Sequence, residues 1–207
     1  MSGVVALQGG GPFQSNDELD RRLLCERGID RVVMLPTADA YETPLALVDS
    51  ALEWGARIGV VVEPLMVLTR DQSNEQSASV IAGARAVVLA GDSAIHLRSV
   101  LKDTPVLEAI VALLDAGGTV IGVGPGAAAL CDPMTDQRGG GFALGLGLVS
   151  GVAVIPGSEQ WPHDQLERAH SLANTPVVDL PTGSALVIDG DRWSTVGNAT
   201  VHGDLPA

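Results

Sequence analysis

The chain has 207 residues, abundant aliphatic side chains, few aromatic ones and a formal net charge of −13 at pH 7. This length predicts one domain, residues 1–207, with a sizeable core. The charge argues against nucleic acids and anionic membranes as partners, because both bind through basic patches. The two cysteines, Cys25 and Cys131, form no disulfide framework and fit a reducing compartment.

Two segments bear on location. The N-terminal residues MSGVVALQGGG lack the basic start and long apolar core of a signal peptide, so we expect a cytoplasmic protein. Residues Gly139–Ser158 carry no charge and are long enough for a membrane helix. Their many glycines break the run into short pieces, and we favour buried short strands.

Apolar β-branched runs alternate with helical patterns in the first two thirds of the chain. The expected strands are Val4–Leu7, Arg31–Leu35, Ile58–Val62, Ala86–Leu89 and Thr119–Val123. The expected helices are Asp17–Glu26, Thr43–Trp54, Asn74–Ala82, Ala94–Val100 and Pro105–Ala116. Short buried strands joined by helices predict an α/β fold with a doubly wound, mainly parallel sheet.

The pattern changes after Asp132. One helix, Pro162–Ala173, stands among short strands expected at Val177–Leu180, Ser184–Ile188, Arg192–Val196 and Ala199–His202. The turn Asp-Gly-Asp between two of these strands predicts a hairpin. We therefore expect a C-terminal antiparallel appendage on the parallel sheet.

Ligands of such sheets bind beyond the carboxyl ends of the strands. Three loops should converge there: Gln8–Phe13 (QGGGPF), Ala90–Ser93 (AGDS) and Gly122–Ala127 (GVGPGA). The third loop is typical of a turn from strand to helix that presents a catalytic nucleophile, yet it contains no Ser or Cys.

Several stretches in order carry a resemblance that extends from about Val4 to His202. They are the glycine-rich loop, MLPTADA, VVLAGDSAIHLRSVLKDTPVLEAI, LLDAGGTVIGVGPGAAA and GLGLVSGVAVIPG. Their order and spacing resemble the cyanophycinase and dipeptidase E family of serine peptidases. The resemblance implies a class I glutamine amidotransferase-like fold.

The same resemblance points to a loss of catalytic residues. The elbow of the family reads Gly-x-Ser-Ala-Gly-Ala, and the serine position falls on Gly124. The family histidine, in Asp-Gln-His-Phe, falls on Gly157, and the family glutamate, in Asp-Glu-x-Thr-Ala-Leu, falls on Thr182. No catalytic residue is left at the three matched positions.

Elementary chemistry supports the same conclusion at the elbow. Glycine at position 124 has no reacting atom and relaxes the strained backbone of such a turn. Pro125 lacks the backbone N–H that would donate to an oxyanion, and losing one such donor typically costs about 10²- to 10³-fold in rate. Gly91 occupies the place of the second oxyanion donor of the family, so part of an anion site is expected to remain. Gly10 and Gly11 can also direct backbone N–H groups toward an anion, or merely form a tight loop.

Other polar residues have structural interpretations that we favour. Ser93 should lie near the pocket but is expected to cap the helix that follows, and Asp92 either binds a cationic ligand group or helps this cap. Cys131 is expected to pack in the core. His163, Glu167 and His170 share a helix face that could hold a divalent metal, although an ordinary solvated face is favoured. The spacing Gly122-x-Gly124-x-x-Ala127 also fits a dinucleotide fingerprint, but a tight turn explains it better.

The leading hypothesis is a catalytically inactive homologue of these peptidases that binds a small ligand, a peptide or a protein partner. We expect no cofactor and no metal, and a homo-oligomer, most simply a dimer, or a complex with an active relative. The alternative is an active hydrolase of aspartyl or isoaspartyl peptides that uses another nucleophile or an activated water. A third hypothesis is a different chemistry in the same cleft, such as a metal-assisted reaction.

Overall fold

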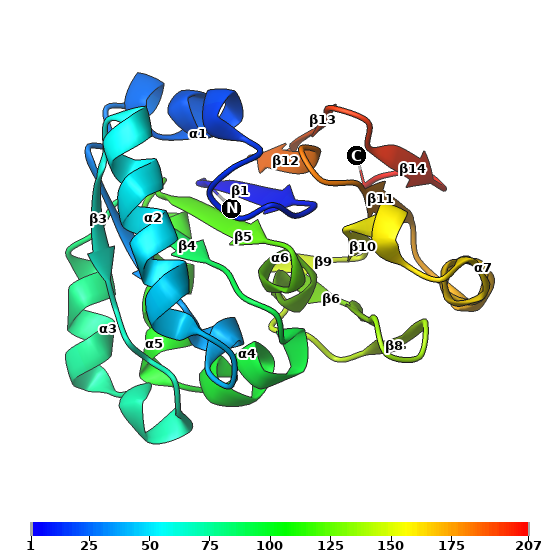
Figure 1. The fold of residues 1–207 in the computed structure, drawn as a ribbon, viewed down its shortest axis with the longest axis horizontal. Coiled ribbons are helices and arrows are strands. Elements are labelled where there is room, and N and C mark those ends of the chain that lie inside the picture. Colours follow the sequence, from blue (N-terminus) through cyan, green and yellow to red (C-terminus); the bar gives the residue numbers. More distant parts are fainter. Residues whose placement is uncertain (1, 207) are drawn as a thin grey trace.

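The computed structural model describes residues 2–206, and its centre is a seven-stranded sheet with the order β13-β12-β1-β5-β4-β2-β3 (Figure 1). The strands are β1 (Val4–Gln8), β2 (Arg31–Leu35), β3 (Val61–Pro64), β4 (Ala86–Leu89), β5 (Thr119–Val123), β12 (Ala185–Asp189) and β13 (Arg192–Val196). The five strands from β1 to β5 run parallel to one another. Strand β12 pairs with β1 in the antiparallel sense, and β13 extends the sheet beyond it.

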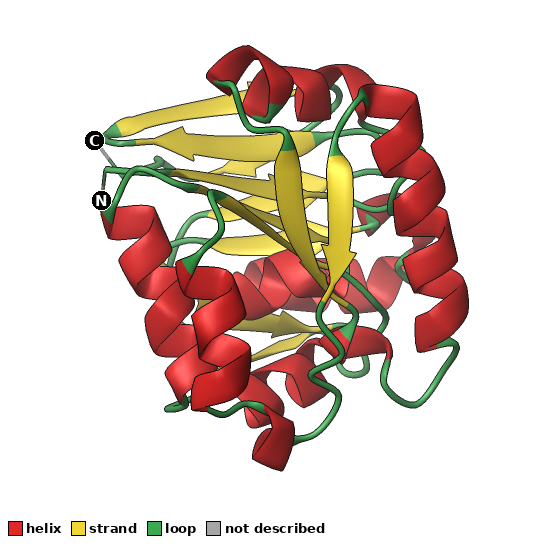
Figure 2. Cartoon of the chain, turned by 90° about the vertical axis from the view of Figure 1, so that its left-hand side faces the viewer, coloured by secondary structure: helices red, strands yellow, loops and turns green. Residues whose placement is uncertain are grey.

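Helices cover both faces of this sheet, which confirms the doubly wound, mainly parallel architecture (Figure 2). One layer contains α1 (Asp17–Leu23) and α2 (Pro44–Ile58). The other contains α3 (Glu75–Ala82), α4 (Ala94–Leu101), α5 (Pro105–Asp115) and α6 (Pro125–Leu130). Because helices shield both faces, all residues of β1, β4 and β5 are buried, and these strands are continuous apolar runs in the sequence.

One expected strand is displaced. The apolar run Ile58–Val62 was expected to be a strand, but Ile58 is the last residue of α2 and β3 begins at Val61. Ile58 continues the buried helix face that contains Ala51 and Trp54. Gly59 then ends the helix with φ +92°, and its N–H donates to the carbonyl of Gly55. The apolar run therefore joins the end of a buried helix face to the start of the next strand, with Gly59 between them.

The C-terminal third adds smaller sheets beside the main one. Its elements are β6 (Cys131–Asp132), β7 (Met134–Asp136), β8 (Gly141–Ala143), β9 (Val149–Ser150), β10 (Ala153–Pro156), α7 (His163–Leu172), β11 (Val177–Leu180) and β14 (Thr200–His202). Strand β11 lies between β10, which is parallel to it, and β14, which is antiparallel. The expected Asp-Gly-Asp hairpin joins β12 to β13, with Asp189 opposite Arg192. The C-terminal antiparallel strands thus divide between the edge of the main sheet and a second, three-stranded sheet.

The uncharged segment Gly139–Ser158 forms the short strands β8, β9 and β10, as expected from its glycines, but only β10 is buried along its whole length. Across residues 2–206, the helices are too short or too polar to cross a membrane.

Candidate functional site

The three loops that were expected to converge form one cleft of about 390 Å³ at the carboxyl ends of β1, β4 and β5. The loop after β1 contributes residues 9–12, the loop after β4 contributes Gly91 and Asp92, and the elbow after β5 contributes residues 123–125. The remaining walls come from the C-terminal third: Gln137, Pro156, Gly157 and Gln160. Parallel strands end at the same edge of a sheet, which is why loops far apart in sequence meet here.

Gly124 retains the backbone of a nucleophile elbow without a nucleophile. Its φ is +58° and its ψ is −129°, a conformation that is strained for any residue with a side chain. A Cβ built on Gly124 would meet no atom within 4 Å, so the site of the absent side chain is open space. The Gly124 N–H donates to the carbonyl of Gln8 at 2.9 Å, which fixes the turn to the end of β1.

Pro125 is the first residue of α6. Proline suits this position, since its φ is set for a helix and the first N–H groups of a helix have no partner within it. The same substitution removes the N–H that would face an oxyanion beside Gly124. The turn is therefore stabilised as structure at the position where a catalytic donor would be needed.

Gly91 faces the elbow from the neighbouring loop. Its φ is +127°, and a Cβ at this position would lie 2.4 Å from the backbone nitrogen of Asp39, so only glycine fits. Among residues 2–206, the N–H groups of Gly10, Gly11 and Gly91 have no hydrogen-bond acceptor. Three unpaired backbone donors around one cleft can bind a carbonyl or carboxylate oxygen of a ligand.

The positions matched to the family histidine and glutamate lie in different places in the structure. Gly157 lines the cleft and has φ +61°, whereas Thr182 lies behind the loop that contains Gly10. Thr182 donates through its hydroxyl to Glu159 at 2.6 Å, and its N–H donates to the same carboxylate. Partial burial works to raise the pKa of Glu159, but these hydrogen bonds outweigh it and hold the pKa below its ordinary value. Glu159 is thus an ionised carboxylate near the cleft. The family motifs in the sequence did not point to this residue.

Ser93 caps α4 as expected, and Asp92 lines the cleft beside it. The Ser93 hydroxyl accepts from the N–H of His96, which makes Ser93 the expected cap of α4. The Asp92 side chain is exposed and lines the cleft. Burial and then, more weakly, the Asp92 charge raise the pKa of the neighbouring Asp39. This side of the cleft is therefore acidic and favours a cationic group.

A smaller cavity of about 80 Å³ continues the cleft past Pro125. Asp92 and Pro125 line both spaces, and Ser93, Asp136 and Arg138 line the smaller one. The larger space is lined by the backbone donors and Asp92, and the smaller one also by Asp136 and Arg138, which carry charges of both signs.

Two other candidates lie outside this cleft. Cys131 is completely buried, and burial raises the pKa of its thiol to about 12, so it cannot act as a thiolate nucleophile at neutral pH. His163 and Glu167 are highly exposed and contact each other at 3.3 Å across one helical turn. His170 does not join them, because it contacts Asp179 of β11 instead.

A buried network under the glycine-rich loop was missed by the sequence reasoning. The Asp20 carboxylate accepts from Gln8 Nε2 at 2.6 Å and from Trp54 Nε1 at 2.9 Å. Asn16 Nδ2 donates to Gln8 Oε1 at 3.2 Å. Desolvation, only partly offset by the two hydrogen bonds, raises the pKa of Asp20 to about 6. No local pattern marks this residue, since its burial depends on β1 and α2.

Comparison with solved structures supports the fold. The crystal structure of a peptidase from an acI-B1 Actinobacterium superposes with a TM-score of 0.85 at 24% identity, covering 98% of this chain and 90% of that one. A putative peptidase E protein from Listeria monocytogenes EGD-e gives a TM-score of 0.75 at 16% identity, covering 94% of this chain and 98% of that one. At these identities the likeness shows a shared fold.

The sequence comparisons place the chain in a family. A search of curated proteins finds no match. The model of Peptidase family S51 matches residues 5–196, which include every loop of the cleft. The resemblance inferred from the order of the sequence motifs is thereby confirmed, and the chain belongs to Peptidase family S51.

Proposed function

We propose that this chain is a catalytically inactive member of family S51 that binds a small peptide-like ligand in the cleft above Gly124. The observation that carries the proposal is the elbow itself. Its backbone has the nucleophile conformation, yet it bears no side chain, and the next residue lacks an N–H. Nucleophile and adjacent oxyanion donor are both missing from a turn that is otherwise intact.

The lining of the cleft supports the class of ligand. The unpaired N–H groups of Gly10, Gly11 and Gly91 suit a carbonyl or carboxylate oxygen. Asp92 stands nearby with an exposed carboxylate and suits an ammonium or guanidinium group. We therefore propose a short zwitterionic peptide, with aspartyl dipeptides such as β-aspartyl-arginine as the first probes.

Hydrolysis tests the catalytic half of the proposal. Purified wild-type protein and Pro125→Ala would be incubated for a day with α- and β-aspartyl dipeptides and followed by mass spectrometry. We expect no cleavage by either, because Pro125→Ala returns an N–H but no nucleophile. Cleavage by the wild type at enzyme-like rates would overturn the proposal, and Ser93→Ala would then test a hydroxyl that lines the adjoining smaller cavity.

Binding tests the other half. Calorimetry would compare β-aspartyl-arginine with β-aspartyl-alanine for wild type, Asp92→Asn and the control Asp191→Asn, which changes the same charge in the exposed β12–β13 turn. Asp92→Asn removes a partly solvated ion pair, so this variant alone should bind the arginine peptide about 2- to 5-fold more weakly than the wild type. The alanine peptide, which lacks the guanidinium, should be weakened less. No binding of either peptide, or equal weakening by Asp191→Asn, would refute the proposed ligand class.

We also propose that the functional form is an oligomer, most simply a dimer with a second copy of this chain or with an active relative. Light scattering of the protein purified from its native source tests this. Recovery of this chain alone at the monomer mass would contradict it.

A further inference from the structure

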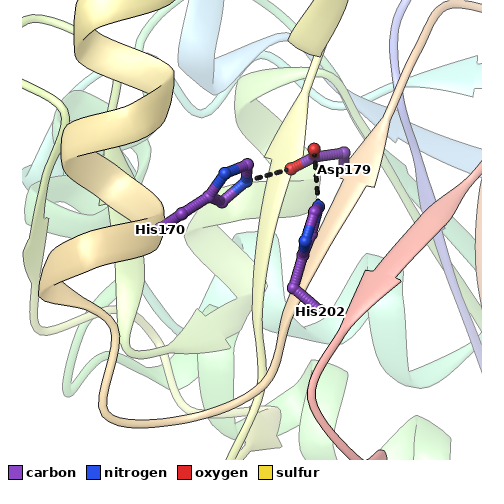
Figure 3. Close-up of side chains that lie close together, drawn as sticks. All are labelled: His170, Asp179 and His202. Carbon is purple, nitrogen blue, oxygen red and sulfur yellow. Dashed lines mark hydrogen bonds and ion pairs between the residues drawn. The ribbon is translucent and has the colours of Figure 1, made fainter.

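Three side chains of metal-ligating type meet at a corner away from the cleft lining. His170 Nε2 lies 2.9 Å from one carboxylate oxygen of Asp179, and His202 Nε2 lies 2.9 Å from the other (Figure 3). The two imidazole rings are 4.1 Å apart between their centres. One carboxylate therefore contacts two histidines whose rings lie next to each other.

Three separate elements bring these residues together. Asp179 belongs to β11 and His202 to β14, whose antiparallel register places Val177 opposite His202 and Asp179 opposite Thr200. Asp179 and His202 are therefore diagonal neighbours on one face of the small sheet. Helix α7 packs on that same face through Ala169, and its last turn carries His170 to the carboxylate (Figure 3).

We propose that His170, Asp179 and His202 form a binding site for a divalent transition-metal ion, with Zn²⁺ as the best fit. One nitrogen or oxygen atom from each residue lies within 4.8 Å of the other two. In a tetrahedral zinc site, with bonds of about 2.0–2.2 Å, donor atoms are separated by about 3.4 Å. Each donor pair is therefore within about 1.4 Å of that spacing in the present arrangement.

The donor set and its surroundings suit zinc. Imidazole nitrogens bind zinc, and zinc sites with three protein ligands keep a fourth position for water or another molecule. The exposed fractions of the side chains are 13% for Asp179, 27% for His170 and 41% for His202, so the carboxylate is shielded while an ion can still enter. Both histidines line an open groove that also contains Thr175 and Asp204.

The site differs from the metal site that the sequence suggested. His163 and Glu167 point to solvent on the same helix, and only His170 of that trio takes part. A metal here would join the end of α7 to β11 and β14, and none of its three ligands lines the cleft above Gly124. A bound metal would therefore stabilise the packing of α7 on the small sheet, whether or not the cleft is catalytically active.

The test uses the tag-free full-length protein after treatment with a chelator. Thermal unfolding is followed with and without ZnCl₂, and Co²⁺ absorption reports the ligands directly. At zinc concentrations about 100-fold above Kd, the unfolding midpoint of the wild type should rise by about 5–10 °C. Binding should weaken on acidification, because both imidazoles must offer an unprotonated Nε2 to the ion.

Matched variants decide the result. Asp179→Asn and His202→Ala should abolish the shift, whereas His163→Ala, which removes an exposed histidine from the same helix, should retain it. Because each folded variant is compared with itself, with and without zinc, a general loss of stability does not imitate the effect. If His202→Ala does not fold, His170→Gln replaces it. No shift in the wild type, or an undiminished shift in Asp179→Asn, would overturn the proposal.

Discussion

The buried carboxylate of Asp20 should make the protein less stable as the pH rises from about 4 to 7. Asp20 is 4% exposed and is held by Gln8 and Trp54, and its pKa rises from 3.8 to about 6 on folding. The folded state therefore binds a proton that the unfolded chain has already released, so the protonated form stabilises the fold at low pH. One pKa unit corresponds to about 1.4 kcal/mol, so ionising Asp20 costs about 3 kcal/mol of folding free energy in full.

The measurable part of this effect lies between pH 5 and pH 7.5. A start at pH 5 keeps the acidic chain above its isoelectric point. Over this range the contribution of Asp20 falls by about 1.4 kcal/mol, because the folded group changes from mostly protonated to ionised. With a denaturant slope of about 2 kcal/mol/M, that change lowers the urea midpoint by about 0.7 M.

Asp20→Asn isolates the effect. Urea unfolding of wild type and variant would be followed by circular dichroism at several pH values. The stability advantage of the wild type over Asp20→Asn should shrink by about 1.4 kcal/mol from pH 5 to pH 7.5. Asn offers one acceptor atom to the Gln8 and Trp54 donors, which lowers the stability of the variant at every pH. This pH-independent loss cancels in the comparison.

Asp17 on the same helix is the matched control. The hydrogen bond from Arg57 holds the pKa of Asp17 below its ordinary value, so its contribution is lost only as the pH falls below about 4. The difference between wild type and Asp17→Asn should therefore change much less from pH 5 to pH 7.5, because the Asp17 charge is only a minor cause of the raised pKa of Asp20. A constant difference for Asp20→Asn would refute the raised pKa of Asp20.

Two further predictions concern the elbow and the thiols. Gly124→Ser should fold, because its Cβ meets no atom within 4 Å. The positive φ at this position should lower the free energy of unfolding by about 1–3 kcal/mol. Gly126→Ser should lose more, because its Cβ would lie 2.3 Å from the Leu89 carbonyl oxygen; equal urea midpoints would contradict this. Cys25, which is exposed, should react with a thiol reagent in the folded protein, whereas Cys131 should react only after unfolding. Mass spectrometry locates the label, and early labelling of Cys131 would show that the core opens.

Local patterns determined the parallel core and the position of the cleft. The short, β-branched apolar run of β5, with glycines on either side, predicts a strand shielded on both faces, and Gly124 and Pro125 mark the sharp turn that follows. Once the strands are parallel, their following loops must meet at one edge. The absence of a reacting side chain at the elbow was also visible in the sequence, because the glycines around it define the alignment.

Tertiary structure decided which distant residues became partners. Short C-terminal strands carry no signal for whether they pair with β1, as β12 does, or with β10, as β11 does. The approach of His202 to His170 depends on that pairing, so nothing in its neighbourhood along the chain distinguished it. The pKa of Asp20 likewise rises only because other elements remove it from water. Periodicity along the chain specifies which face of an element is buried, whereas burial of a single polar group depends on elements that fold against it from elsewhere in the sequence.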